Sequence, residues 1–152
     1  MFAHQTEHLF SYRVDIAPPQ VVGPCPGDVR FNFPLTGGEV WGPRLSGKVR
    51  AGGADFATLR TDGVIILDVR GLLESNDGAL IDIAYSGVLD LGPDGYANFL
   101  KGEMPQALLI RAAPRFRTAH PSYQWLNRLQ CYAIGEADLA KQNATYDVYA
   151  LR

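Results

Sequence analysis

The chain has 152 residues, 47% of them hydrophobic and 20% charged, with a formal net charge of −2. This length suits one domain with a single core, and the hydrophobic fraction excludes a disordered chain. The scattered basic residues give no patch that would bind nucleic acid or a membrane surface. The chain also has no apolar run near the roughly 20 residues that span a bilayer and no signal-peptide pattern at its start, so we expect a cytoplasmic protein.

Glycine and proline residues, 16 and 10 in number, punctuate the chain at intervals typical of an all-β sandwich or barrel. Strands are expected over residues 8–16, 28–36, 39–51, 54–61, 64–73, 79–91, 108–118, 128–136 and 145–151. Gly37-Gly38 is interpreted as a hairpin turn, residues 96–101 as the one short helix, and residues 121–127 as a loop or short helical turn. The prediction is a single domain over residues 1–152, an all-β, mostly antiparallel barrel of eight to nine strands.

The strand at residues 64–70 is apolar on both faces, because Ile65, Leu67 and Val69 alternate with Val64 and Ile66. One face can line the barrel interior, whereas the other needs a cover. That cover is either a second sheet layer or another subunit. We favour a homo-oligomer, a dimer or a higher assembly.

Two turn signals bracket this strand, Asp62-Gly63 before it and Asn76-Asp77-Gly78 after it. Two-residue loops at Asp62-Gly63 and at Asn76-Asp77 fix the register of the strand against both neighbours. In that register four polar residues share one otherwise apolar face: Asp55, Asp68, Arg70 and Tyr85.

This face predicts a catalytic cluster inside the barrel, with Asp55 and Asp68 as candidate bases. Arg70 would hold an anionic or carbonyl oxygen, and Tyr85 would act as a donor or acid. A carboxylate in an apolar cavity has its pKa raised toward useful values. The alternative is an ion-pair network that only fixes the barrel.

Four further residues are candidates for substrate binding. Glu39 and Trp41 share a face after the Gly37-Gly38 turn and are predicted to reach a pocket mouth. Trp125 and Asn127 are interpreted as part of a lid, with the indole stacking on a ligand and the amide orienting it. A packed surface turn and a plug that closes one barrel end are the respective alternatives.

The sequence carries no signal for a metal or a cofactor. Cys25 and Cys131 are too few for a disulfide framework, and the three histidines lack metal-ligand spacing. The chain also has no nucleophile elbow and no Gly-rich phosphate loop before a helix. We therefore expect no cofactor and no bound metal.

Several short segments together resemble the family of uncharacterised bacterial and fungal proteins called domain of unknown function 3237. The segments are GGEVWGPRLSG at 37–47, GGADF at 52–56, RTDG at 60–63, DGALI at 77–81, PRFRT at 114–118 and WLNR at 125–128. One departure is Phe56, where the family more often has tryptophan. The resemblance implies a compact antiparallel β-barrel that tends to form oligomers, and it brings no settled activity.

Two functions follow from the residues. The first is a cofactor-independent acid–base enzyme, of lyase, isomerase or cyclase type, acting on a small organic molecule in the barrel. The second is a non-catalytic carrier or binding protein for a small molecule. Carboxylates that meet tyrosine or arginine in the cavity would favour the enzyme, and we lean toward it because Asp55 and Asp68 are costly to bury without a purpose.

Overall fold

The structure, a computed structural model, describes all 152 residues and contains ten strands and two short helices. The strands are β1 (Thr6–Ile16), β2 (Gln20–Cys25), β3 (Asp28–Trp41), β4 (Gly47–Val49), β5 (Ala54–Arg60), β6 (Val64–Ser75), β7 (Leu80–Asp90), β8 (Ala107–Arg117), β9 (Gln130–Asp138) and β10 (Asn143–Leu151). The helices are α1 (Gly95–Leu100) and the 3-10 helix η1 (Pro121–Arg128). No helix has the length and apolar character needed to cross a membrane.

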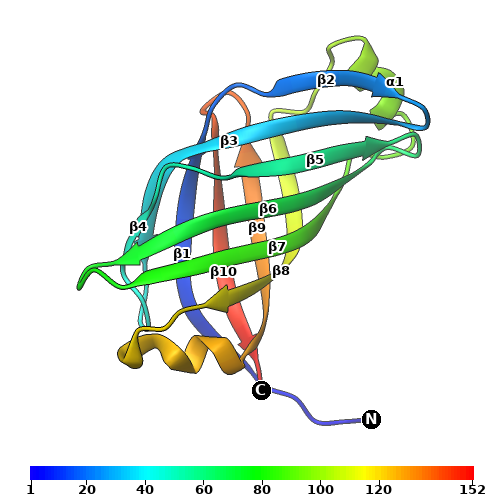
Figure 1. The fold of residues 1–152 in the computed structure, drawn as a ribbon. Coiled ribbons are helices and arrows are strands. Elements are labelled where there is room, and N and C mark those ends of the chain that lie inside the picture. The colour runs from blue at the N-terminus through cyan, green and yellow to red at the C-terminus, as the bar shows by residue number, and fades with distance from the viewer.

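The predicted antiparallel barrel is confirmed (Figure 1). Eight strands form the ring, in the order β1, β10, β9, β8, β7, β6, β5 and β3, and the pairing of β1 with β3 closes it. Two extra strands join this ring. β4 lies between β3 and β6 beyond the part of these two strands that pairs with β5. β2 pairs with β3 alone. Closure leaves the ring with no free sheet edge, as a barrel requires.

The predicted turn at Gly37-Gly38 and the long strand over residues 39–51 are wrong. β3 runs through both glycines. It pairs with β5 over residues 28–34, with β1 from Leu35 onward and with β4 from Gly38 onward. A Cβ atom on Gly38 would lie 2.0 Å from the carbonyl oxygen of Arg13, and the φ of Gly38 is +147°. Only glycine fits this approach of two backbones, which is the point where β3 crosses to β1 and closes the barrel.

The two ends of the barrel differ (Figure 1). η1 lies across one end, near both chain termini, and α1 and β2 lie at the other. Toward the η1 end the interior is filled by large apolar side chains, among them Leu9, Phe10, Leu73, Ile81, Phe116 and Leu126. Toward the α1 end the interior is open as a cavity, described below.

The outer wall carries exposed apolar side chains on adjacent strands. Val88 of β7, Leu109 of β8 and Ile134 of β9 are all exposed, and Val88 and Ile134 both pair with Arg111. The sequence-based expectation concerned β6, whose outer face carries the half-buried Val64 and Ile66 and then the exposed Asp68 and Arg70, so this face is apolar only over its first half. The homo-oligomer that we inferred from it stays a prediction.

Candidate active site

The hairpins on either side of β6 have three-residue loops, at residues 61–63 and 76–78, rather than the two-residue loops predicted. Each loop ends in a glycine with positive φ, +86° at Gly63 and +87° at Gly78. The N–H of each glycine donates to the carbonyl three residues earlier. A left-handed glycine closing such a turn is a common alternative to the two-residue hairpin. As a result β6 is displaced by one residue against both neighbours, and its side chains change face.

This displacement divides the predicted cluster. Asp68 and Arg70 lie on the outer wall, with side chains 53% and 62% exposed, and form an ion pair at 3.3 Å. Their predicted place in the cavity is wrong. Asp55 and Tyr85 stay inside, because β5 and β7 are displaced equally against β6. Both residues pair with Val69, so they flank it in one row across three strands.

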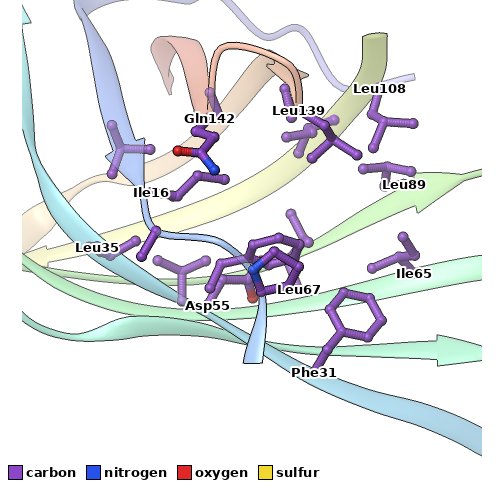
Figure 2. A pocket seen from close by; sticks show the side chains of 18 of the residues that line it. Ile16, Phe31, Leu35, Asp55, Ile65, Leu67, Leu89, Leu108, Leu139 and Gln142 are labelled. Carbon is purple, nitrogen blue, oxygen red and sulfur yellow. The ribbon is translucent and has the colours of Figure 1, made fainter. Parts of the chain in front are cut away.

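The cavity has a volume of about 280 Å³ and is lined by 24 residues, of which 20 are hydrophobic. It opens between α1, the segment after β1 and the loop between β9 and β10, and Phe31, Ile65 and Leu108 form part of its wall (Figure 2). Its polar groups are the carboxyl of Asp55, the amide of Gln142 and the phenols of two tyrosines. The cavity therefore suits a small, mainly apolar molecule with few polar contacts.

Asp55 lies beside a gap in the pairing of β5 with β6, since Phe56 and Ala57 have no partner in β6. Its Oδ1 accepts a hydrogen bond of 3.0 Å from the backbone N–H of Asp68. The nearby carbonyl of Phe56 instead accepts from the Arg30 guanidinium, which also lies 3.3 Å from Oγ1 of Thr58. Burial raises the pKa of Asp55 to about 6, and the charge of Asp68 adds to this rise, while the hydrogen bond from Asp68 and the charge of Arg30 oppose it. The group is thus poised to exchange protons near neutral pH.

Three tyrosines cluster beside Asp55. The rings of Tyr12 and Tyr146 stack at 4.8 Å, and Tyr85 meets Tyr146 edge-on at 5.7 Å. Tyr85 and Tyr146 line the cavity, whereas the hydroxyl of Tyr12 is buried without a hydrogen-bond partner. Burial raises the pKa of all three phenols well above their ordinary value. They therefore remain protonated at neutral pH, and the phenols of Tyr85 and Tyr146 are available to donate hydrogen bonds to a molecule in the cavity.

Sequence reasoning missed Tyr146, Arg30 and Gln142. Tyr146 had a signal, since Ala144, Tyr146 and Val148 alternate as the inner face of the last strand. Arg30 and Gln142 reach the site only through the pairing of β3 with β5 and the closure of the barrel. Nothing in their local sequence marks them.

The prediction that Glu39 and Trp41 reach the pocket mouth is wrong. Both are exposed, and they flank Val40, which is buried in the interior. Alternation along β3 therefore turns both side chains outward. Neither lines the cavity.

The predicted lid residues lie at the opposite end of the barrel from the cavity. Asn127 holds the chain as it leaves β8, because its Oδ1 accepts from the N–H of Thr118 and its Nδ2 donates to the Thr118 carbonyl, both at 2.9 Å. Trp125 lies under the guanidinium of Arg44, 4.6 Å from the ring centre. η1 thus forms a plug, the alternative interpretation of this segment, and Trp125 and Asn127 do not contact the cavity.

Comparisons with known proteins agree with this fold. The model of a family described as protein of unknown function (DUF3237) matches residues 4–151. A UPF0311 protein of Rhodopseudomonas palustris (strain TIE-1) is 35% identical over 148 residues, 95% of each chain. The crystal structure of the conserved protein of unknown function RPA1785 from R. palustris superposes with a TM-score of 0.88 at 29% identity, over all of both chains. A hydroalkoxylation enzyme of Penicillium herquei is 27% identical over 126 residues, 83% of this chain and 70% of that one.

Proposed function

The chain belongs to the DUF3237 family, and from that premise we propose that it is a cofactor-independent enzyme performing acid–base chemistry on a small molecule in the barrel cavity. One observation carries the proposal: the carboxyl of Asp55 lines an apolar cavity beside the phenols of Tyr85 and Tyr146. A carboxyl in such surroundings destabilises the folded state. Ionisable groups that proteins keep in this way are concentrated at functional sites.

The distant hydroalkoxylation enzyme supports a reaction class. Hydroalkoxylation adds the O–H bond of an alcohol or phenol across a carbon–carbon double bond. No electrons are gained or lost, so the reaction needs only a base, an acid and stabilisation of the charge that develops. These are the groups that the cavity provides.

We assign the roles as follows. Ionised Asp55 takes the proton of the substrate hydroxyl, and the oxygen bonds to the β-carbon of an alkene conjugated with a carbonyl. The π electrons move onto the carbonyl oxygen, where the phenols of Tyr85 and Tyr146 donate hydrogen bonds to the developing charge. The α-carbon then takes the proton back from Asp55 and the carbonyl re-forms. The product is a cyclic ether when both groups belong to one molecule, and the reverse sequence is an elimination.

The test uses neutral phenols that carry a conjugated enone next to the hydroxyl, from 2-hydroxyphenyl vinyl ketone to 2′-hydroxychalcone. In heavy water the product gains one deuterium at the α-carbon. For the chalcone, an enzyme-formed ring has one handedness, whereas the spontaneous product is racemic. We expect Asp55→Asn to lower kcat by about 100-fold or more, because general acid–base catalysis contributes at least that much. The matched control, Asp62→Asn, should stay within about 3-fold, because Asp62 lies on an exposed loop and does not line the cavity.

The alternative function is a non-catalytic carrier, favoured by the 20 hydrophobic residues among the 24 that line the cavity. A carrier would bind these phenols without turnover, and Asp55→Asn would leave their affinity unchanged or improved. Tight binding across the panel with only racemic product would therefore favour the carrier over the enzyme.

A further inference from the structure

Gln142 has an unusual backbone. It is the only residue other than glycine with a positive φ, +54°. It ends the loop that joins β9 to β10, and its carbonyl accepts a hydrogen bond of 2.9 Å from the N–H of Ile16. The left-handed conformation favours glycine or asparagine, so a glutamine there carries strain that glycine would remove.

The side chain of Gln142 lines the cavity from its mouth. Figure 2 shows it on the loop between β9 and β10, across the open space from Asp55 and Leu67. The walls between are apolar, with Ile16 and Leu139 beside the glutamine and Leu67 beside the carboxyl. The cavity thus has one polar region on its floor, at Asp55 and the tyrosines, and one at its mouth.

The charge of the lining limits the ligand. No lysine, arginine or histidine lines the cavity, while Asp55 brings a negative charge when ionised. An anionic molecule would find no partner for its charge and would be repelled by the carboxylate. The lining therefore disfavours an anion, and its mainly apolar walls suit a neutral molecule.

We infer that Gln142 determines substrate specificity: its amide hydrogen-bonds a second polar group, at the outer end of a neutral substrate whose reacting hydroxyl lies at Asp55. An amide both donates and accepts, so the outer group is a hydroxyl or a carbonyl. The need for this amide accounts for a strained glutamine where glycine would fit better. The inference rests on the proposed function only for the orientation of the substrate.

Two variants separate the amide from the strain. Gln142→Leu keeps a side chain of similar size in the same strained backbone and removes the amide. Gln142→Gly removes both. We expect Gln142→Gly to raise the melting temperature by about 2–4 °C, because relief of a left-handed conformation is felt on that scale in a domain of this size. Gln142→Leu should melt within about 1 °C of the wild type.

Binding is measured by calorimetry with three probes that have no activated alkene, so the result does not depend on catalysis. The probes are 2-naphthol with one polar end, 2,6-dihydroxynaphthalene with two, and 6-hydroxy-2-naphthoate with an anionic end. We expect the wild type to prefer the two-ended diol over 2-naphthol by about 3- to 10-fold, the range of one net hydrogen bond, and to bind the naphthoate more weakly than the diol. Both variants should lose the preference for the diol.

Asp55→Asn should keep that preference, because its origin is at the mouth. Equal affinity of the wild type for the diol and 2-naphthol, or no binding of either, would overturn the inference. If Gln142→Leu still prefers the diol over 2-naphthol, the preference comes from another group, and the inference is likewise overturned. A loss of catalysis in Asp55→Asn with no role for Gln142 would leave the proposed function standing, so the two failures are distinguishable.

Discussion

The backbone N–H of Asp68 donates a hydrogen bond of 3.0 Å to the carboxylate of Asp55, although the Asp68 side chain lies on the outer wall of the barrel. One residue thus acts on the site in two ways. Its backbone fixes the Asp55 carboxylate, and its side-chain charge, through the wall, raises the pKa of Asp55. A side-chain substitution removes the second effect and keeps the first.

We therefore predict that Asp68→Asn preserves the fold and lowers the pKa of Asp55. Removal of the outer negative charge favours ionisation of the inner carboxyl. The exposed ion pair with Arg70 contributes little, so the free energy of unfolding should change by less than about 1 kcal/mol. The pKa is measured from the ¹³C chemical shift of the Asp55 carboxyl during a pH titration, with Asp62→Asn, on an exposed loop, as the control.

The second prediction concerns stability against pH. The pKa of Asp55 rises from 3.8 to about 6 on folding. Between these values the folded state binds more protons than the unfolded state, so the contribution of Asp55 to the free energy of unfolding falls as pH rises. Relative to Asp55→Asn, the wild type should lose about 3 kcal/mol at most between pH 3 and 7, and nothing further above that.

Denaturant unfolding of both proteins at a series of pH values checks this. The free energy of unfolding of Asp55→Asn is subtracted from that of the wild type, which removes the contribution of the carboxylates that both proteins contain. If this difference in the free energy of unfolding does not change from pH 3 to 7, the pKa of Asp55 is not raised on folding. A difference that grows in favour of the wild type would mean that the carboxylate is stabilised by its partners rather than penalised by burial.

The third prediction is that Arg30→Met raises the pKa of Asp55 above about 6, because the guanidinium charge opposes the effect of burial. The variant should also lose about 1–3 kcal/mol of stability, since the carbonyl of Phe56 loses its donor. The same carboxyl titration measures the pKa. Arg30→Lys retains the charge and is the matched control, with a smaller shift expected. An unchanged pKa in Arg30→Met would show that Arg30 only braces the backbone.

Much of the fold could be predicted from alternation and turns, but the register could not. Asp62-Gly63 and Asn76-Asp77-Gly78 mark both hairpins, yet the same residues suit a two-residue loop and a three-residue loop closed by a left-handed glycine. One extra loop residue turns Asp68 and Arg70 outward. Asp55 and Tyr85 were identified correctly as a pair on one face, because the same error occurred on both sides of β6 and cancelled between its neighbours.

The rest of the site depends on contacts between distant parts of the chain. Tyr12 and Tyr146 meet because β1 pairs with β10, and Arg30 reaches the carbonyl of Phe56, next to Asp55, because β3 pairs with β5. Gln142 faces the cavity only because the loop between β9 and β10 folds over the barrel end (Figure 2). Local patterns predict which face of a strand is buried, whereas ring closure decides which buried residues meet.

The last prediction tests that closure at Gly38, where a Cβ atom would lie 2.0 Å from the carbonyl oxygen of Arg13 and where φ is +147°. In Gly38→Ala either β3 or β1 must move, because the nearest atoms belong to the backbone, and the backbone conformation is strained as well. We expect a loss of about 4 kcal/mol or more in the free energy of unfolding.

Gly78→Ala is the matched control for Gly38→Ala. Gly78 also has a positive φ, +87°, but its added Cβ atom would meet nothing within 4 Å. The free energy of unfolding of Gly78→Ala should therefore fall only by the cost of the left-handed conformation, about 1–2 kcal/mol. Urea unfolding measures both variants, and a Gly38→Ala chain that stays insoluble while Gly78→Ala folds is the same result in its extreme form. Equal losses in the two variants would mean that β3 and β1 can separate at Gly38 without cost, so that their close approach there contributes little to the stability of the barrel.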